Sequence, residues 1–152
     1  MDDLKRLRIA FKARSDEFAA AMSADFGRRS RHESLLSDTF TVLKEIDYTR
    51  RHLRGWMRPK RALADWLFWP AHTEVRYQPL GVVGIIAPWN YPVNLALKPL
   101  IAAIAAGNHV MLKPSEHTPR TSELLKKMLD EVFPADRVAT ILGGPDVAAA
   151  FD

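Results

Sequence analysis

Asn90 is the residue of this chain best placed to do chemistry. It lies between two prolines in the segment Pro88-Trp89-Asn90-Tyr91-Pro92, directly after an apolar run. A side-chain amide in such a place can donate a hydrogen bond to an oxygen that becomes negatively charged during a reaction. Asparagine is also a common turn residue, and the residue type alone favours a turn between the prolines. The choice between the two depends on the surrounding elements.

Lys113 and Glu116 form a second candidate pair, in the segment Lys113-Pro114-Ser115-Glu116. A lysine and a carboxylate can bracket the two hydroxyls of a ribose, because the ammonium donates hydrogen bonds and the carboxylate accepts them. The carboxylate would also repel a 2′-phosphate, which favours NAD over NADP as the cofactor. The structural alternative is a surface lysine at the end of a strand and a glutamate in the loop before a helix.

Gly143 and Gly144 come before a short predicted helix that begins at Pro145. Glycines between a strand and a helix allow a close approach to a pyrophosphate. Two adjacent glycines support this weakly, and a tight structural turn is the favoured interpretation. The chain has no cysteine and its five histidines lack metal-ligand spacing, so no disulfide and no metal site are predicted.

Strands and helices alternate from residue 82 onwards. The predicted elements are strands at 82–87, 109–113 and 138–142, with helices at 95–106 and 118–132. The continuous apolar run from Val82 to Ala87 is typical of a parallel strand buried on both faces, and Thr118-Pro119 fits an N-cap followed by a first-turn proline. The alternation predicts an open parallel sheet with right-handed connections. Asn90 would then lie past the carboxyl end of the first strand, at the edge where ligands bind.

Residues 1 to about 58 are predicted to be helical. One apolar stripe indicates a first helix that ends at Gly27, and its residues are Leu4, Leu7, Phe11, Phe18 and Met22. Ser30 and Glu33 fit a capping box at the start of a second helix, which Pro59 stops. The apolar positions of this second helix are Leu36, Phe40, Leu43, Ile46, Leu53 and Trp56. Residues 73–78 alternate between polar and apolar side chains and predict a strand with one exposed face.

The composition is that of a soluble globular protein, with 47% apolar residues, 26% charged residues and a net charge of +4. The basic segment from Arg50 to Arg61 is interpreted as a solvated helix end rather than a nucleic-acid-binding patch. No apolar stretch approaches the roughly 20 residues of a membrane span, and no secretory signal follows the acidic N-terminus. The sequence therefore predicts a cytoplasmic protein without membrane or nucleic-acid partners.

The segments around Asn90 and Lys113 closely resemble the aldehyde dehydrogenase superfamily, whose pattern at the first is proline, tryptophan, asparagine, an aromatic residue and proline. The stretches 23–27, 31–33 and 53–59 are similar to the branch that includes the coniferyl-aldehyde dehydrogenases and the class 3 enzymes. The resemblance implies that Asn90 polarises the aldehyde oxygen. The cofactor-binding candidates for NAD, with NADP as the alternative, are Ile86, Ala87, Trp89, Lys113, Glu116 and Gly143.

The implied fold is α/β: an N-terminal helical segment followed by the first half of a Rossmann-type open parallel sheet, which makes an incomplete aldehyde dehydrogenase fold. Residues 1–72 would form the helices and a connector, residues 73–81 a strand of the oligomerisation region, and residues 82–152 a partial NAD(P)-binding domain. The resemblance covers nearly the whole chain and about the first third of a family member.

The implied enzyme oxidises an aldehyde, by its branch an aromatic one of the coniferyl type, to a carboxylic acid through a cysteine thiohemiacetal. A homo-oligomer, dimer or tetramer, is expected for the full-length protein. Because this chain has no cysteine, the nucleophile is expected outside it, and the 152 residues alone are expected to be inactive. The alternative is an inert, truncated NAD-binding module.

Overall fold

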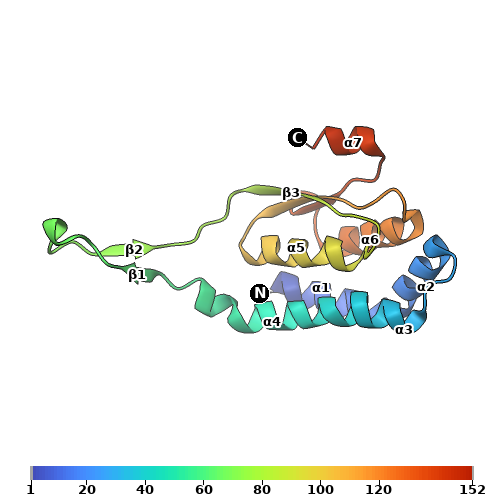
Figure 1. Cartoon of the computed structure of the whole chain (residues 1–152), viewed down its shortest axis with the longest axis horizontal. Coiled ribbons are helices and arrows are strands. Elements are labelled where there is room, and N and C mark those ends of the chain that lie inside the picture. Colours follow the sequence, from blue (N-terminus) through green and yellow to red (C-terminus); the bar gives the residue numbers. More distant parts are fainter. Residues whose placement is uncertain (1, 152) are drawn as a thin grey trace.

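The chain folds around a three-stranded parallel sheet with its main helices stacked on one side (Figure 1). The computed structural model describes residues 2–151. The strands lie in the order β3, β4, β5, and their bounds are Val82–Ile86, His109–Lys113 and Val138–Thr140. The connecting helices are α5, Asn94–Ala105, and α6, Pro119–Val132. The predicted alternation and the parallel pairing of the strands are confirmed.

One face of this sheet is exposed, so the prediction that the first strand is buried on both faces is wrong. Ile85 is 6% exposed, whereas Val82 and Ile86 are 63% and 53% exposed. Figure 1 shows α5 and α6 on one side of the sheet and the short helix α7 (Pro145–Ala149) on the other. Since alternate residues of a strand point to opposite faces, every second side chain of β3 lies on the sparsely covered face.

The N-terminal apolar stripe is buried as predicted, but it lies on two helices rather than one. Helix α1 covers Asp2–Ala13 and α2 covers Ser15–Phe26. The chain turns between them at Arg14, whose N–H donates to the carbonyl of Phe11. Periodicity did not reveal this break, because both helices direct their apolar residues into the same core. Gly27, with φ of 80°, ends α2 as predicted.

The predicted capping box is wrong, and the second helix buries only part of its predicted apolar positions: Ile46 and Leu53 are buried, but Ser34–Phe40 forms a π-helix, η1. The helices before and after it are α3, Arg31–Glu33, and α4, Thr41–Trp56. Ser30 makes no side-chain capping hydrogen bond. In a π-helix residue i bonds to i+5, so side chains three or four residues apart no longer share a face. Leu36 and Phe40 are consequently 67% and 51% exposed, while Asp38 is fully buried.

An antiparallel hairpin connects α4 to the sheet and extends away from both (Figure 1). Its strands are β1 (Lys60–Ala62) and β2 (Thr73–Val75), with the short helix η2 (Trp66–Phe68) between them. Strand β1 has no counterpart among the sequence predictions, because its residues do not alternate in polarity. Strand β2 ends at Val75 instead of Gln78.

Helix α6 begins at Pro119 as predicted, but its cap comes from another helix. The predicted N-cap residue Thr118 makes no side-chain capping hydrogen bond. Instead, the Asp25 carboxylate accepts from the N–H groups of Arg120 and Thr121 at 3.1 and 2.9 Å, and from the Thr121 hydroxyl at 2.7 Å. A carboxylate there satisfies two free N–H groups and suits the positive end of the helix dipole. Asp25 thereby joins α2 to α6.

We expect Asp25→Ala to lower the free energy of unfolding by about 2 kcal/mol, because a charged helix cap and its hydrogen bonds are lost. Urea unfolding followed by circular dichroism measures this change. Asp16→Ala is the control, since Asp16 lies on the same helix, caps no other helix within residues 2–151 and makes only a surface ion pair with Arg31 there, its side chain being 77% exposed. The control should change the free energy of unfolding by less than about 0.5 kcal/mol. Equal losses in the two variants would contradict the capping role.

Candidate functional site

The candidate residues gather at the edge of the sheet where β3, β4 and β5 end. Because the strands are parallel, their carboxyl ends lie at one edge. Ile86 pairs with Lys113 in the register of β3 and β4, and the N–H of Ala87 donates to the Lys113 carbonyl at 2.9 Å. Ile86 is half exposed and Ala87 is buried. The candidates that follow the first and second strands are therefore neighbours in space.

Asn90 lies in an exposed bend after β3. Its carbonyl accepts a hydrogen bond of 2.9 Å from Nη1 of Arg29. Its side-chain amide makes no hydrogen bond with another residue between 2 and 151, so the donor is free. Trp89, beside it, is 53% exposed, and its ring centroid lies 6.2 Å from that of Phe26. A turn and a donor role are thus compatible for Asn90, because the residue is exposed in the bend.

Lys113, at the end of β4, is buried and paired with Glu116. The Lys113 side chain is 2% exposed, and its Nζ lies 2.8 Å from Oε2 of Glu116. The hydrogen bond from Lys113 lowers the pKa of Glu116, so this carboxylate stays ionised at neutral pH. The alternative of a surface lysine is therefore wrong. Burial of the ammonium against its carboxylate restricts both groups to one geometry.

The turn between these two residues is held by Ser115. Its hydroxyl accepts a hydrogen bond of 3.2 Å from the N–H of His117, and its carbonyl accepts one of 2.9 Å from the hydroxyl of Ser122 in α6. Ser115 and Ser122 are both buried. The loop that presents Glu116 is consequently anchored to the first turn of α6.

Gly143 follows β5 at the same edge, before α7. A Cβ atom added to Gly143 would lie 2.3 Å from Cγ2 of Val147. Valine is stiff at χ1 and cannot move its methyl group away cheaply. The packing requires glycine here and supports the interpretation of a tight turn, and cofactor binding by Gly143 stays a prediction.

Neither a metal-binding cluster nor a membrane-spanning helix occurs in the part of the chain that the structure describes. Residues 2–151 contain no group of three or more His, Cys, Asp or Glu side chains arranged to hold a metal ion. Within the same range, no helix has both the length and the apolar character that a membrane crossing needs.

The residues that hold the Asn90 turn were not predicted from the sequence. Arg29 lies in the loop after α2 and bonds to the carbonyl of Asn90, 61 residues away. Asp38 lies in η1 and bonds to the N–H of Asn94, 56 residues away. No local spacing relates residues so far apart, and the π-helix that buries Asp38 has no signature in the stripe pattern.

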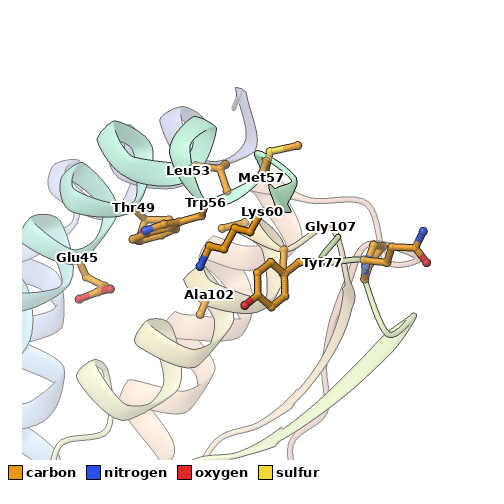
Figure 2. A pocket seen from close by; sticks show the side chains of 13 residues that line it. Glu45, Thr49, Leu53, Trp56, Met57, Lys60, Tyr77, Ala102 and Gly107 are labelled. Carbon is orange, nitrogen blue, oxygen red and sulfur yellow. The ribbon is translucent and has the colours of Figure 1, made fainter. Parts of the chain in front are cut away.

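A cavity of about 690 Å³ lies away from this edge (Figure 2). Pro79 and Gly107 line it, and they precede β3 and β4, so it lies towards the amino ends of the strands. Figure 2 shows the side chains of Trp56, Lys60 and Tyr77 around it, with the Lys60 Nζ 5.4 Å from the centroid of the Tyr77 ring. None of the predicted site residues lines this cavity. The candidate site at the carboxyl edge is therefore separate from this cavity.

Comparisons with known proteins agree with the family that the sequence resembles. The model of the aldehyde dehydrogenase family matches residues 2–151. A probable coniferyl aldehyde dehydrogenase of Pseudomonas aeruginosa is 46% identical over 148 residues, which cover 97% of this chain and 31% of that protein. Aldehyde dehydrogenase family 3 member B1 of Homo sapiens is 37% identical over 165 residues, with 95% of this chain and 35% of that protein covered.

Solved structures show the same likeness in three dimensions. The substrate-bound state of Staphylococcus aureus AldH is similar to this chain with a TM-score of 0.93 and 33% identity, covering 98% of this chain and 32% of that one. The chain thus spans about a third of the length of the relatives that it matches.

Proposed function

This chain belongs to the aldehyde dehydrogenase family, and we propose that it is part of an NAD(P)-dependent enzyme that oxidises an aldehyde to a carboxylic acid. One observation supports this most. The free amide of Asn90 follows β3 at the same sheet edge as the buried pair of Lys113 and Glu116, which follows β4. An oxyanion donor and a ribose-binding pair would then serve one site.

Asn90 is proposed to donate a hydrogen bond from its side-chain amide to the aldehyde oxygen as that oxygen gains negative charge. A preorganised donor of this kind stabilises the transition state more than the ground state. The proposed nucleophile is a cysteine thiolate that attacks the aldehyde carbon to form a thiohemiacetal. The 152 residues contain no cysteine, so the nucleophile would come from outside them, and the carboxylate that activates water is proposed to come from there as well.

The carboxyl edge fits the adenosine end of a nicotinamide dinucleotide. Lys113 and Glu116 offer a donor and an ionised acceptor 2.8 Å apart, which suits two adjacent ribose hydroxyls. NAD is proposed over NADP, because the Glu116 carboxylate would repel a 2′-phosphate. A nicotinamide cofactor held there would supply the acceptor for the hydride from the thiohemiacetal carbon. The other residues proposed to border it are Ile86, Ala87, Trp89 and Gly143.

An aromatic aldehyde of the coniferyl type is the proposed substrate, because the relative of that name is 46% identical to this chain. We also propose a homo-oligomer that uses the hairpin of β1 and β2. Leu63, Trp66 and Trp69 are 103%, 81% and 84% exposed there. Apolar side chains so exposed at a protruding element are typical of protein interfaces.

Aldehyde oxidation by the natural protein tests this function. We expect it to reduce NAD when coniferyl aldehyde is added, which is measured by the absorbance of NADH. We also expect it to release the corresponding acid, which is measured by chromatography. The 152 residues expressed alone should bind NAD but produce no NADH. If the natural protein binds NAD but oxidises no aldehyde, the alternative of an inert NAD-binding module is favoured. Turnover by the 152 residues alone would contradict the proposed cysteine mechanism.

Glu116→Gln should reduce discrimination against NADP. The amide keeps the shape of the side chain but removes the negative charge, so KM for NADP is expected to fall about tenfold, or roughly 1.4 kcal/mol. Initial rates with each cofactor measure the ratio of kcat/KM values. Glu123→Gln is the matched control, because Glu123 is exposed on α6. An unchanged cofactor ratio in Glu116→Gln would argue against contact with the ribose.

A further inference from the structure

We infer that Arg29, which Asp38 holds in place, is a positioning residue. It would place Asn90 so that the side-chain amide can donate to the aldehyde oxygen as that oxygen gains negative charge. The inference rests on the catalytic role proposed above for Asn90. Arg29 does not itself reach the reacting atoms in this arrangement, since its contact is with the carbonyl of Asn90 rather than with the side-chain amide.

The guanidinium of Arg29 is fixed from four directions. Its Nη1 donates to the carbonyl of Asn90 at 2.9 Å, and its Nη2 donates to Oδ2 of Asp38 at 3.0 Å. Its central carbon lies 5.0 Å from the ring centroid of Phe26 and 5.1 Å from that of Tyr91. The side chain is 6% exposed. A planar cation that lies near two rings and makes two directed hydrogen bonds has little freedom to rotate.

Asp38 connects the same ion pair to the other end of the turn. Its Oδ1 accepts the N–H of Asn94 at 2.9 Å, at the first residue of α5. The side-chain amide of Asn94 donates to the carbonyl of Ser37 at 2.7 Å and to the hydroxyl of Thr41 at 3.0 Å. Two consecutive helices, η1 and α4, therefore hold the start of α5.

The bend from Asn90 to Asn94 is consequently held at both ends by one buried ion pair. The hydrogen bond from Arg29 fixes the peptide plane that follows the Asn90 Cα, and a fixed plane restrains the backbone rotation that sets the position of the Asn90 Cβ. Asn90 has no side-chain hydrogen bond with residues 2–151 that could orient it independently. The position from which the Asn90 amide donates thus depends on the backbone contact with Arg29.

Burial makes the ion pair of Arg29 and Asp38 sensitive to the charge and shape of both side chains. Asp38 is fully buried, and loss of hydration raises its pKa, while the N–H of Asn94 and the charge of Arg29 oppose that rise. Glu33, 3.7 Å from Nη2 of Arg29, is the other charged group that faces the pair. A lysine in place of Arg29 keeps the charge, but its single ammonium cannot reproduce the planar, two-directional contact.

Arg29→Lys in the natural protein tests the inference. We expect kcat for aldehyde oxidation to fall about 10- to 100-fold, because small displacements of a catalytic group have effects of this size. KM for NAD should stay within twofold. Arg8→Lys is the matched control. Arg8 contacts Asp47 through two hydrogen bonds of 2.7 and 3.0 Å. Asp47 lies in α4, roughly 13 Å along the helical axis from Asp38.

A double-mutant cycle with Asn90→Ala identifies the route of the effect. If Arg29 acts through Asn90, Arg29→Lys should change kcat less than about threefold once Asn90 is alanine, because residues that act as a unit are not additive. Asp38→Asn provides a second variant for the same cycle if Arg29→Lys does not fold. The positioning role would be overturned if Arg29→Lys lowered kcat equally in the unchanged protein and in Asn90→Ala, or no more than Arg8→Lys does. In that case Asn90→Ala alone would still lower kcat. If Asn90→Ala alone leaves kcat unchanged, the oxyanion role fails first and the inference fails with it.

Discussion

Asn90→Ala is expected to lower kcat for aldehyde oxidation about 10²- to 10³-fold, the size of loss measured when one oxyanion donor is removed. The proposed hydrogen bond strengthens as charge develops on the aldehyde oxygen, so kcat and kcat/KM for the aldehyde should fall together. KM for NAD should not change, because the pair proposed to bind the ribose, Lys113 and Glu116, follows a different strand. Steady-state rates of the natural protein, with aldehyde and NAD varied in turn, measure all three quantities.

Tyr91→Phe is the control for Asn90→Ala. It changes the adjacent residue of the same bend, and it keeps the aromatic ring that lies 5.1 Å from the Arg29 guanidinium carbon. Its kcat should stay within twofold of the unchanged protein, because the hydroxyl of Tyr91 forms no hydrogen bond within residues 2–151. A comparable loss in both variants would indicate that any disturbance of the bend lowers kcat, and the specific donor role would be lost.

Phe18→Ala should lower the free energy of unfolding by about 3–5 kcal/mol, the usual cost of removing a buried phenylalanine ring. Phe18 is fully buried, and its ring centroid lies 5.3 Å from that of Phe11 on the preceding helix. The cavity left behind would separate α1 from α2 at the turn between them. Urea unfolding followed by circular dichroism at constant temperature measures the loss.

Phe40→Ala supplies the matched comparison. Phe40 has the same side chain and is one of the apolar positions of the predicted second helix, but it is 51% exposed on η1. Its ring contacts the Nζ of Lys44 at 5.3 Å, and an exposed cation–π contact contributes about 0.5–1 kcal/mol. A loss in Phe40→Ala as large as that in Phe18→Ala would mean that the π-helix does not turn Phe40 outward.

The candidate site was predicted where its residues are local in sequence. Asn90, and the pair of Lys113 and Glu116, each lie within a few residues of the end of a strand, and strand ends can be recognised from apolar runs. Parallel strands then bring those ends to one edge. Arg29 and Asp38 could not be predicted in the same way, because they meet the Asn90 bend through contacts between distant segments.

Sequence alone determined the order of the elements in the sheet region, the parallel pairing and the motifs at the strand ends. These follow from periodicities of two and 3.6 residues and from turn residues, which depend on neighbours in the chain. Tertiary structure decided which face of β3 is covered, where the first helix breaks and which carboxylate caps α6. It also decided that Asp38 is buried while Phe40 is exposed. The physical reason is that burial depends on which distant segment packs against a residue, and a local period of apolar side chains does not specify that segment.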